Sequence, residues 1–370
     1  MRLPCILLAL FFCAVAAPGR GVAAGAGTAV TDISQLGGVD YRIDIPANWN
    51  HGLVVYFHGY AVDPVTFRPG DALSPMFAPI LAGGFAVIQS AYSATGWAVE
   101  EGSTDTEKLR RHFIGKYGEP KETFVMGISM GGTLTAMTIE SKPETYDGAL
   151  SLCGAIEPTD RFMQRDFALR AAFDYYFPDL LGPLVPVSAD YTPSDAVVHR
   201  IAAAMRANPK ATASVRALYG AADAESLPGV IAAISYDIKE MQQRLRDNPF
   251  ANADLVYTGS GDDFALNDGV KRYRAEPRAA AYLSRWYTPT GQLTRPMLAL
   301  HDSGDPLVVA STAFEYALIA QRAGHADHFV QQYVNAHGHC VFTPEQVGKA
   351  FDELVAWKRD GKRPQSGRQR

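Results

Sequence analysis

Short runs of β-branched and other apolar residues alternate with longer amphipathic stretches in two separate parts of the chain. Such runs, closed by Gly, Pro, Asn or Asp, are typical of buried strands, and the stretches between them have helical spacing. The expected strands cover residues 41–45, 53–57, 85–89, 123–127, 149–153, 297–301 and 329–334. The alternation predicts an α/β fold with a mostly parallel central sheet and helices on both faces.

Helices are expected where the chain must cross from one strand to the next. Residues 104–117 carry Leu109, Phe113 and Ile114 at helical spacing and stop at Gly118, which is a usual helix end. Further helices are expected directly after residue 129 and at 312–323 and 343–359. The last begins with Thr-Pro-Glu, a helix start signal.

Residues 155–290 break this rhythm, because they hold helical stretches at 161–177, 196–207 and 230–246 with no strand between them. We interpret this segment as an inserted helical cap. Its many aromatic residues are expected to pack it onto the main domain, and the alternative is that they line an acyl or aryl pocket. Residues 28–154 and 291–360 then form the main domain. Residues 361–370 are basic and rich in Gly, Pro and Gln, which is typical of a flexible tail.

The first 24 residues have the pattern of a signal peptide. Arg2 precedes a nearly continuous apolar run over 3–17, and small residues follow at plausible cleavage positions. The run is shorter than the ~20 residues that a membrane-spanning helix needs. We therefore expect a secreted or periplasmic protein with no membrane span in the mature chain.

Composition excludes several classes of partner. The 370 residues are 47% hydrophobic and 20% charged, which is ordinary for a globular protein. A net charge of −5 provides no positive field for a phosphate backbone, so nucleic acid is not an expected partner. A small-molecule substrate is expected, and the oligomeric state is not specified by the sequence.

The sharpest chemical signal is the run Gly127-Ile128-Ser129-Met130-Gly131-Gly132, which follows a predicted strand and precedes a helix. It matches G-x-S-x-G in the context that this motif requires. A serine hydroxyl becomes a useful nucleophile when a tight turn lifts it to where a base can reach it. Only small side chains fit around such a turn, so Ser129 is the predicted nucleophile.

Backbone donors for the developing oxyanion are expected on two sides of this turn. The strand at 53–57 ends in His58-Gly59-Tyr60, which suggests the N–H of Tyr60 as one donor. The N–H of Met130 is the other, because it lies at the start of a helix whose first amides have no helical partner. His58 itself is expected to orient the loop.

The orienting carboxylate is expected after the strand at 297–301. Asp302 and Asp305 both follow this strand. Asp305 is preferred because it lies farther past the strand end beside a proline, whereas Asp302 is interpreted as a turn former. Glu157, after the strand at 149–153, is a rival from a different position in the fold.

The general base is expected after the last strand, where the sequence reads His337-Gly338-His339. His339 is preferred because a glycine precedes it and the closing helix follows, and His337 is interpreted as a solvated loop residue. The chain order Ser129, Asp305, His339 differs from the orders found in chymotrypsin and subtilisin types.

Together these motifs resemble the α/β-hydrolase superfamily, in particular bacterial secreted serine esterases. The resemblance rests on the serine turn, on Ala91-Tyr92-Ser93 with Gly96-Trp97, and on Gly338-His339-Cys340-Val341-Phe342-Thr343. It covers roughly residues 38–155 and 290–357. It implies triad roles for Ser129, Asp305 and His339 and oxyanion roles for Tyr60 and Met130.

The sequence differs from two subgroups of the superfamily, in its oxyanion loop and in the position of its cysteines. The oxyanion loop reads His-Gly-Tyr where one lipase and esterase branch has His-Gly-Gly-Gly. A cysteine beside the catalytic histidine is also found in tannase-like and feruloyl esterases, but those place its partner just before the nucleophile, where this chain has Ile128.

The expected function is hydrolysis of carboxylic esters through an acyl-enzyme on Ser129. A secreted serine peptidase of the same fold is the alternative, and Glu100-Glu101 or Asp262-Asp263 are candidate anchors for a substrate amine. A non-catalytic binding protein on the same scaffold is a third possibility. No cofactor and no metal are expected, because no ligand spacing or Gly-rich phosphate loop is present.

Four cysteines occur in the sequence, and Cys5 and Cys13 lie in the predicted signal peptide. Cys153 and Cys340 would remain after cleavage, one at the end of a central strand and one beside the proposed base. The histidine loop must arch back over the sheet to reach Ser129, which brings the two cysteines near each other. We therefore expect a Cys153–Cys340 disulfide in an oxidising compartment.

Overall fold

The structure is a computed structural model that describes residues 28–220 and 225–369. The predicted signal peptide, residues 1–24, lies outside these residues. The described chain divides into two compact units, one formed by Pro158–Thr288 and one formed by the residues before and after it. The first unit spans nearly the same residues as the insertion expected at 155–290.

In the described residues of the second unit, nine strands form one sheet in the order β1-β2-β4-β3-β5-β6-β7-β8-β9. From β4 through β9 all neighbouring strands are parallel, and β1 and β2 add an antiparallel edge. The strands are β1 (Thr28–Leu36), β2 (Val39–Pro46), β3 (Gly52–Phe57), β4 (Phe85–Ser90), β5 (Glu122–Ile128), β6 (Gly148–Leu152), β7 (Met297–Gly304), β8 (Phe329–His337) and β9 (Gly367–Arg368). The predicted α/β fold with a mostly parallel sheet is confirmed.

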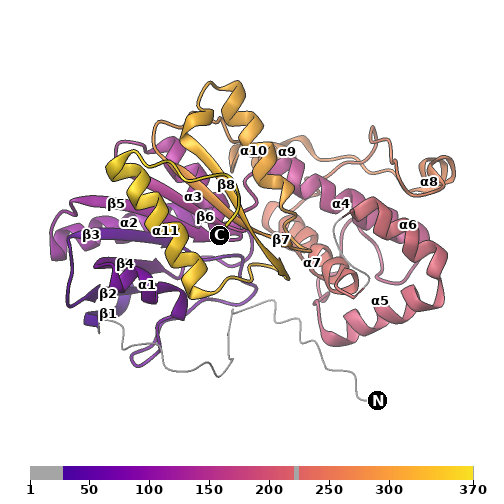
Figure 1. The fold of residues 1–370 in the computed structure, drawn as a ribbon. Helices are drawn as coiled ribbons and strands as arrows, with labels where there is room; N and C mark the ends of the chain where they lie inside the picture. Colours follow the sequence, from indigo (N-terminus) through magenta and orange to yellow (C-terminus); the bar gives the residue numbers. More distant parts are fainter. Residues whose placement is uncertain (1–27, 221–224, 370) are drawn as a thin grey trace, which may run out of the picture. The chain divides into compact units, whose positions relative to one another are not determined.

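Helices cover both faces of this sheet (Figure 1). One face carries α2 (Val99–Tyr117), α3 (Met130–Ser141) and α10 (Ser311–Arg322), and the other carries α1 (Ala78–Ala82) and α11 (Pro344–Asp360). Short 3₁₀ turns, η1 (Pro75–Phe77) and η2 (Ala326–His328), complete the connections. Helix α2 begins at Val99 instead of the expected residue 104, because Val99 and Gly102 are buried and extend its packed face.

Aromatic side chains join α11 to the sheet. The Phe351 ring meets Phe85 and Phe124 edge-on, at centroid separations of 5.0 and 5.5 Å. Thr343 and Gln346 form a capping box that fixes the start of this helix. The helix therefore begins at a defined point just after the loop that carries His339.

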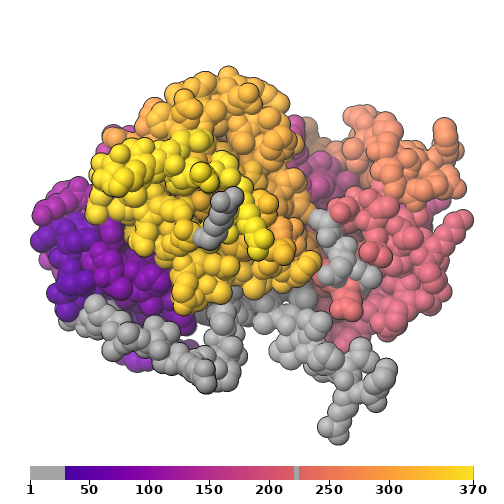
Figure 2. Space-filling model, viewed as in Figure 1, coloured from indigo at the N-terminus to yellow at the C-terminus, as the bar shows by residue number. Residues whose placement is uncertain are grey.

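The sequence analysis missed β1 and β9. Strand β1 is an edge strand with many exposed positions, and it joins β2 through Gly37-Gly38, both with positive φ; a Gly-Gly pair between two runs is a hairpin signal. Strand β9 lies within 361–370, which we had interpreted as a flexible tail. It pairs with β8, and the amide of Gln369 adds a hydrogen bond to Tyr333. The C-terminal residues, in yellow, lie on the surface of this unit in Figure 2.

The unit Pro158–Thr288 is helical in its described residues. It contains α4 (Thr159–Tyr176), α5 (Asp195–Ala207), α6 (Pro209–Tyr219), α7 (Leu227–Leu245), α8 (Asp263–Gly269) and α9 (Pro277–Arg285). Several of its aromatic residues form the unit's own interior: Phe167 stacks on Phe250 and Phe173 on Phe177. No helix in the described part of the chain is long and apolar enough to cross a membrane.

We predict that Phe351→Ala lowers the free energy of unfolding by about 3–5 kcal/mol, because it removes a buried ring that contacts two strands. Phe314 on α10 is 57% exposed, so Phe314→Ala should change stability by less than about 0.5 kcal/mol. Urea denaturation of both variants tests the packing of α11. Equal effects would contradict it.

Candidate active site

Ser129 lies on a sharp turn between β5 and α3. Its backbone has φ 56° and ψ −123°, a left-handed conformation that is unfavourable for a residue with a side chain. Two hydrogen bonds hold the turn: the Ser129 amide donates to Leu152 at 2.9 Å, and the Gly132 amide donates to the Ser129 carbonyl at 2.8 Å. The turn therefore presents the hydroxyl at the carboxyl edge of the sheet.

The glycines around this turn are required by close backbone contact. A Cβ at Gly127 would overlap the carbonyl group of Gly131, and a Cβ at Gly131 would overlap the carbonyl group of Phe57. A Cβ at Gly59 would lie 3.2 Å from the Ser129 Cβ. Small residues before and after the serine thus let β3, β5 and α3 approach one another.

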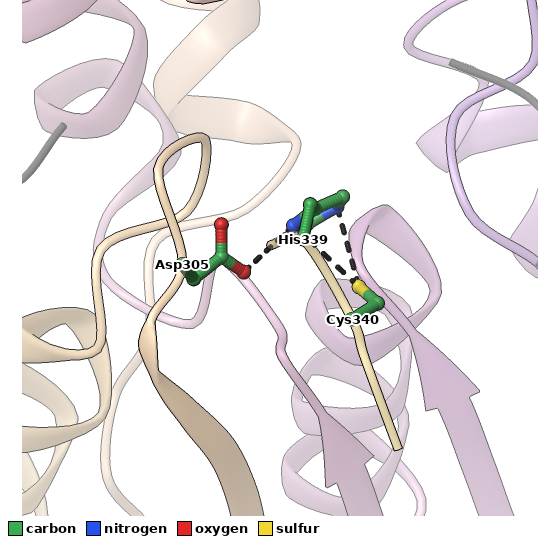
Figure 3. A group of neighbouring side chains, drawn as sticks. All are labelled: Asp305, His339 and Cys340. Atoms are coloured by element: carbon green, nitrogen blue, oxygen red, sulfur yellow. Dashed lines mark hydrogen bonds and ion pairs between the residues drawn. The ribbon is translucent and has the colours of Figure 1, made fainter. Parts of the chain in front are cut away.

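The structure brings Ser129, His339 and Asp305 together in one hydrogen-bonded chain. His339 Nδ1 lies 2.7 Å from Asp305 Oδ2, and His339 Nε2 lies 2.8 Å from the Ser129 hydroxyl. A carboxylate only accepts, so Nδ1 carries the proton and Nε2 is free to accept from the serine. Figure 3 shows the Asp305 carboxylate directed at the imidazole.

Asp305 is buried and held by backbone amides as well as by histidine. Its Oδ1 accepts from the amides of Leu307 at 2.8 Å and Val308 at 2.9 Å. Burial alone would raise the pKa of Asp305, but the positive charge of His339, the hydrogen bond from its ring and the nearby His301 ring hold this pKa at about 2. Asp305 therefore stays ionised over the whole range in which a hydrolase works, and its contribution to stability is lost only as the pH falls from about 4 toward 2.

The same interaction acts on His339. Burial would lower the pKa of His339, but the charge of Asp305, the hydrogen bond to it and the charge of Asp302 together raise the pKa above its ordinary value. A higher pKa makes the imidazole a stronger proton acceptor once it is neutral. It also moves the pH at which the neutral form appears upward.

The proposed oxyanion donors lie on the two segments that meet at Ser129. Tyr60 follows β3 on the loop whose Gly59 approaches the serine, and Met130 is the first residue of α3. The loop is tied down by an antiparallel bridge between Ala61 and Gly96. An anion formed beside Ser129 would also face the positive end of the α3 dipole.

His58 has a structural setting. Its ring stacks on Tyr92 with centroids 3.7 Å apart, Nδ1 lies 2.7 Å from the carbonyl of Gly59, and the Tyr92 hydroxyl donates to the His58 carbonyl at 3.3 Å. Burial lowers the pKa of His58 to about 4, so this side chain is neutral near pH 7. It links the Tyr60 loop to the loop after β4.

The rival residues occupy other positions. Glu157 is buried beyond the end of β6, and His337 is the exposed last residue of β8. Asp302 is not the turn former that we had expected: it lies within β7 and is fully buried. His301, which the sequence analysis did not single out, faces Asp305 with Nε2 3.7 Å from Oδ2 and 2.7 Å from the carbonyl of Val308. The sequence signal that could have identified it is its position next to Asp302 and four residues before Asp305.

The Cys153–Cys340 disulfide that the sequence suggested is present. Both cysteines have positive φ, 44° and 60°, and the Cys153 amide donates to Leu300 at 2.8 Å. The Cys340 sulfur lies 3.3 Å from His339 Nε2 and 3.6 Å from Nδ1, beside the ring as drawn in Figure 3. The bridge thus links the end of β6 to the loop that carries the proposed base.

Asp305, His339 and Cys340 also form the group of potential metal ligands that the described residues bring within 4.8 Å of one another. A metal site would need the Cys340 thiolate, which the disulfide removes. The imidazole nitrogens already face Asp305 and Ser129. This geometry suits proton transfer along the chain of three residues and offers no open set of metal ligands.

No protein-family model matches the sequence, and no curated protein matches it. Solved structures do resemble the fold. A feruloyl esterase B from Aspergillus oryzae is similar with a TM-score of 0.50 at 12% identity, over 90% of this chain and 80% of that one. A provisionally assigned dipeptidyl aminopeptidase IV from Bacteroides ovatus is similar with the same TM-score at 13% identity, over 90% of this chain.

The chain spans only 35% of the length of the Bacteroides ovatus protein. At these identities the likeness shows the fold alone. The sheet order, the helices on both faces and these neighbours together define an α/β-hydrolase fold.

We predict that Cys153 and Cys340 resist alkylation in the denatured protein until a reductant is added, because they are joined. In the chain-entropy model the bridge stabilises by up to about 5 kcal/mol, so the double variant Cys153→Ala/Cys340→Ala should unfold at lower temperature and show no response to reductant. Peptide mapping and thermal unfolding measure these outcomes. Alkylation of both cysteines without reductant would exclude the bridge.

Proposed function

We propose that this protein is an exported serine hydrolase that cleaves carboxylic esters through an acyl-enzyme on Ser129. One observation carries the proposal: the hydrogen-bonded chain from Ser129 through His339 to Asp305, formed at the carboxyl edge of an α/β-hydrolase sheet. His339 is the general base, Asp305 orients it, and the amides of Tyr60 and Met130 receive the oxyanion.

Acylation follows from this geometry. Ser129 Oγ attacks the ester carbonyl carbon while its proton moves to His339 Nε2, which already lies 2.8 Å away. The carbonyl oxygen takes up negative charge, for which the proposed amide donors are each worth roughly 3–4 kcal/mol in the transition state. When the tetrahedral intermediate collapses, the carbon–alkoxide bond breaks and the alcohol leaves with the proton from Nε2.

Deacylation repeats the sequence with water as the nucleophile. Water gives a proton to His339 Nε2 and adds to the acyl carbon, and the Ser129 oxygen then leaves and recovers that proton. Throughout, Asp305 remains ionised and balances the imidazolium charge. The products are a carboxylic acid and an alcohol.

Export is part of the proposal. The pattern of residues 1–24 and the Cys153–Cys340 bridge both suit maturation in an oxidising compartment. A cytosolic environment would keep these thiols reduced.

Peptide hydrolysis is the second candidate, because the fold is shared by an esterase and by a protein assigned as an aminopeptidase. An aminopeptidase needs a carboxylate free to bind the substrate amine. Asp262 accepts from the Ala265 amide as the cap of α8, and Asp263 accepts from the amides of Gly259 and Ser260. Because both carboxylates already serve this turn, they are poor candidates for an amine anchor, and Glu100-Glu101 at the start of α2 is the pair that a peptidase would use.

The triad assignment is tested by a fluorophosphonate probe, which reacts with an activated serine. Wild-type protein should label and Ser129→Ala should not, since only the hydroxyl is removed. His339→Ala should lower kcat by about 10⁴-fold or more, as removal of a triad member does, whereas His337→Ala should change it little. Labelling of Ser129→Ala would refute the nucleophile, and a reversed histidine result would move the base to His337.

The scissile bond is tested by turnover of p-nitrophenyl esters of increasing chain length against aminoacyl-anilides. We expect kcat/KM for the best ester to exceed that for any anilide by at least about 1,000-fold, above the roughly 10–200-fold difference that a single methylene contact produces. Ser129→Ala serves as the blank for both substrate classes. Faster turnover of anilides with a free amine would favour the peptidase.

A further inference from the structure

Asp302 is a buried carboxylate for which no structural role is evident. It lies in β7 with no exposed surface, and within the described residues neither of its carboxylate oxygens has a hydrogen-bond partner. An unpartnered buried carboxylate normally costs stability. A backbone hydrogen bond links it to the site, because its carbonyl accepts from the Asp305 amide at 3.3 Å.

The charges that act on Asp302 belong to the proposed active site. They are those of Asp305, His301 and His339. The elements packed around β7 add little. Strand β6 carries no titratable side chain, and β8 carries Tyr333 and the exposed His337. Helix α11 carries Glu345, Lys349, Asp352, Glu353, Lys358, Arg359 and Asp360, and none of these is among the groups that shift the pKa of Asp302. The charge of Asp302 therefore acts on the proposed triad, although its side chain forms no hydrogen bond with Ser129, His339 or Asp305.

The coupling acts in both directions. Burial, followed by the charge of Asp305, raises the pKa of Asp302 to about 6, against smaller opposing effects of His301 and His339. The charge of Asp302 in turn contributes to the raised pKa of His339. Above about pH 6, Asp302 and Asp305 are thus both negatively charged near the single imidazole of His339.

We infer that Asp302 is a positioning residue of the reaction that acts through His339: its buried negative charge stabilises the imidazolium formed when Ser129 attacks. Asp305 fixes the ring and its tautomer by direct contact, and Asp302 adds electrostatic stabilisation without touching the ring or the substrate. The inference rests on the proposed function, because it assigns His339 the role of base.

The direction of the effect follows from the sign of the charge. Asp302→Asn removes a negative charge near the imidazole, so the pKa of His339 falls and the acidic limb of the kcat/KM profile moves to lower pH. In a protein interior of high effective dielectric, the loss of one neighbouring charge corresponds to a shift of about 0.5–1 pH unit in the pKa of His339. The plateau kcat should fall about 3–10-fold, because the imidazolium is less stable in the transition state.

The variant should fold. Since the folded-state pKa of Asp302 is raised, its charge opposes folding above about pH 6. Asp302→Asn is thus expected to melt at or above the wild-type temperature at pH 8. Asp302→Glu keeps the charge and should restore a limb close to that of wild type.

The experiment measures kcat/KM on p-nitrophenyl acetate from pH 4.5 to 9 for wild type, Asp302→Asn, Asp302→Glu and the exposed-carboxylate control Glu345→Gln. We expect only Asp302→Asn to move the acidic limb downward. A folded Asp302→Asn variant whose limb is unchanged or moves upward would overturn the inference, because a purely structural carboxylate would alter stability and leave the limb in place.

A second measurement needs neither turnover nor a folded variant. The His339 ring protons of the wild-type protein, followed by NMR over the same pH range, should report two ionisations, that of His339 and that of Asp302. A single ionisation would overturn the inference. If both ionisations appear in a protein that hydrolyses no ester, the proposed function fails while the coupling between Asp302 and His339 stands.

Discussion

The geometry of the candidate active site depends on one steric constraint, the contact between backbones where the turn after β5 meets the end of β3. At Gly127 and Gly131 the chain has no room for a larger side chain, and at Gly59 a Cβ would be in tight contact with Ser129. This contact forces Ser129 into a left-handed conformation and brings the start of α3 beside the Tyr60 loop. The strain at one residue is thereby held by three elements of the rigid sheet, which is how a folded enzyme sustains an unfavourable dihedral.

Electrostatics in this site are organised around one imidazole. Asp305 has two backbone amides on one oxygen and His339 on the other, so it is strongly stabilised as an anion. Asp302 lies a few residues earlier in the chain without such support, and its pKa moves in the opposite direction. The pKa values of the two aspartates thus differ because Asp305 accepts hydrogen bonds from protein donors, whereas Asp302 is buried without them.

The parts of the fold that the sequence predicts well are those in which a local pattern has a strict geometric cause. The buried strands at 53–57, 85–89 and 123–127 are apolar because both faces are covered. The serine turn can be recognised in the sequence because its glycines are sterically required. The positions of Asp305 and His339 could be proposed because the superfamily resemblance supplies the chain order.

Other features depend on tertiary contacts that the sequence pattern does not reveal. Edge strand β1 is polar on its exposed face, and β9 exists only because β8 offers it a partner. Asp302 appeared to be a turn residue, since aspartate after a strand usually is, and only the tertiary structure reveals its burial. Helix α8 begins with two aspartates, which suggested surface charge or an amine anchor instead of a helix cap.

The disulfide also has a consequence for the local dynamics of the chain. Loops of the kind that follows β8 commonly open independently of the core, with a free energy far below that of global unfolding. Here Cys340 is covalently attached to Cys153, whose amide is bonded to Leu300 within the sheet. Opening of the histidine loop must therefore disturb the central strands, so the loop belongs to the same cooperative unit as the sheet.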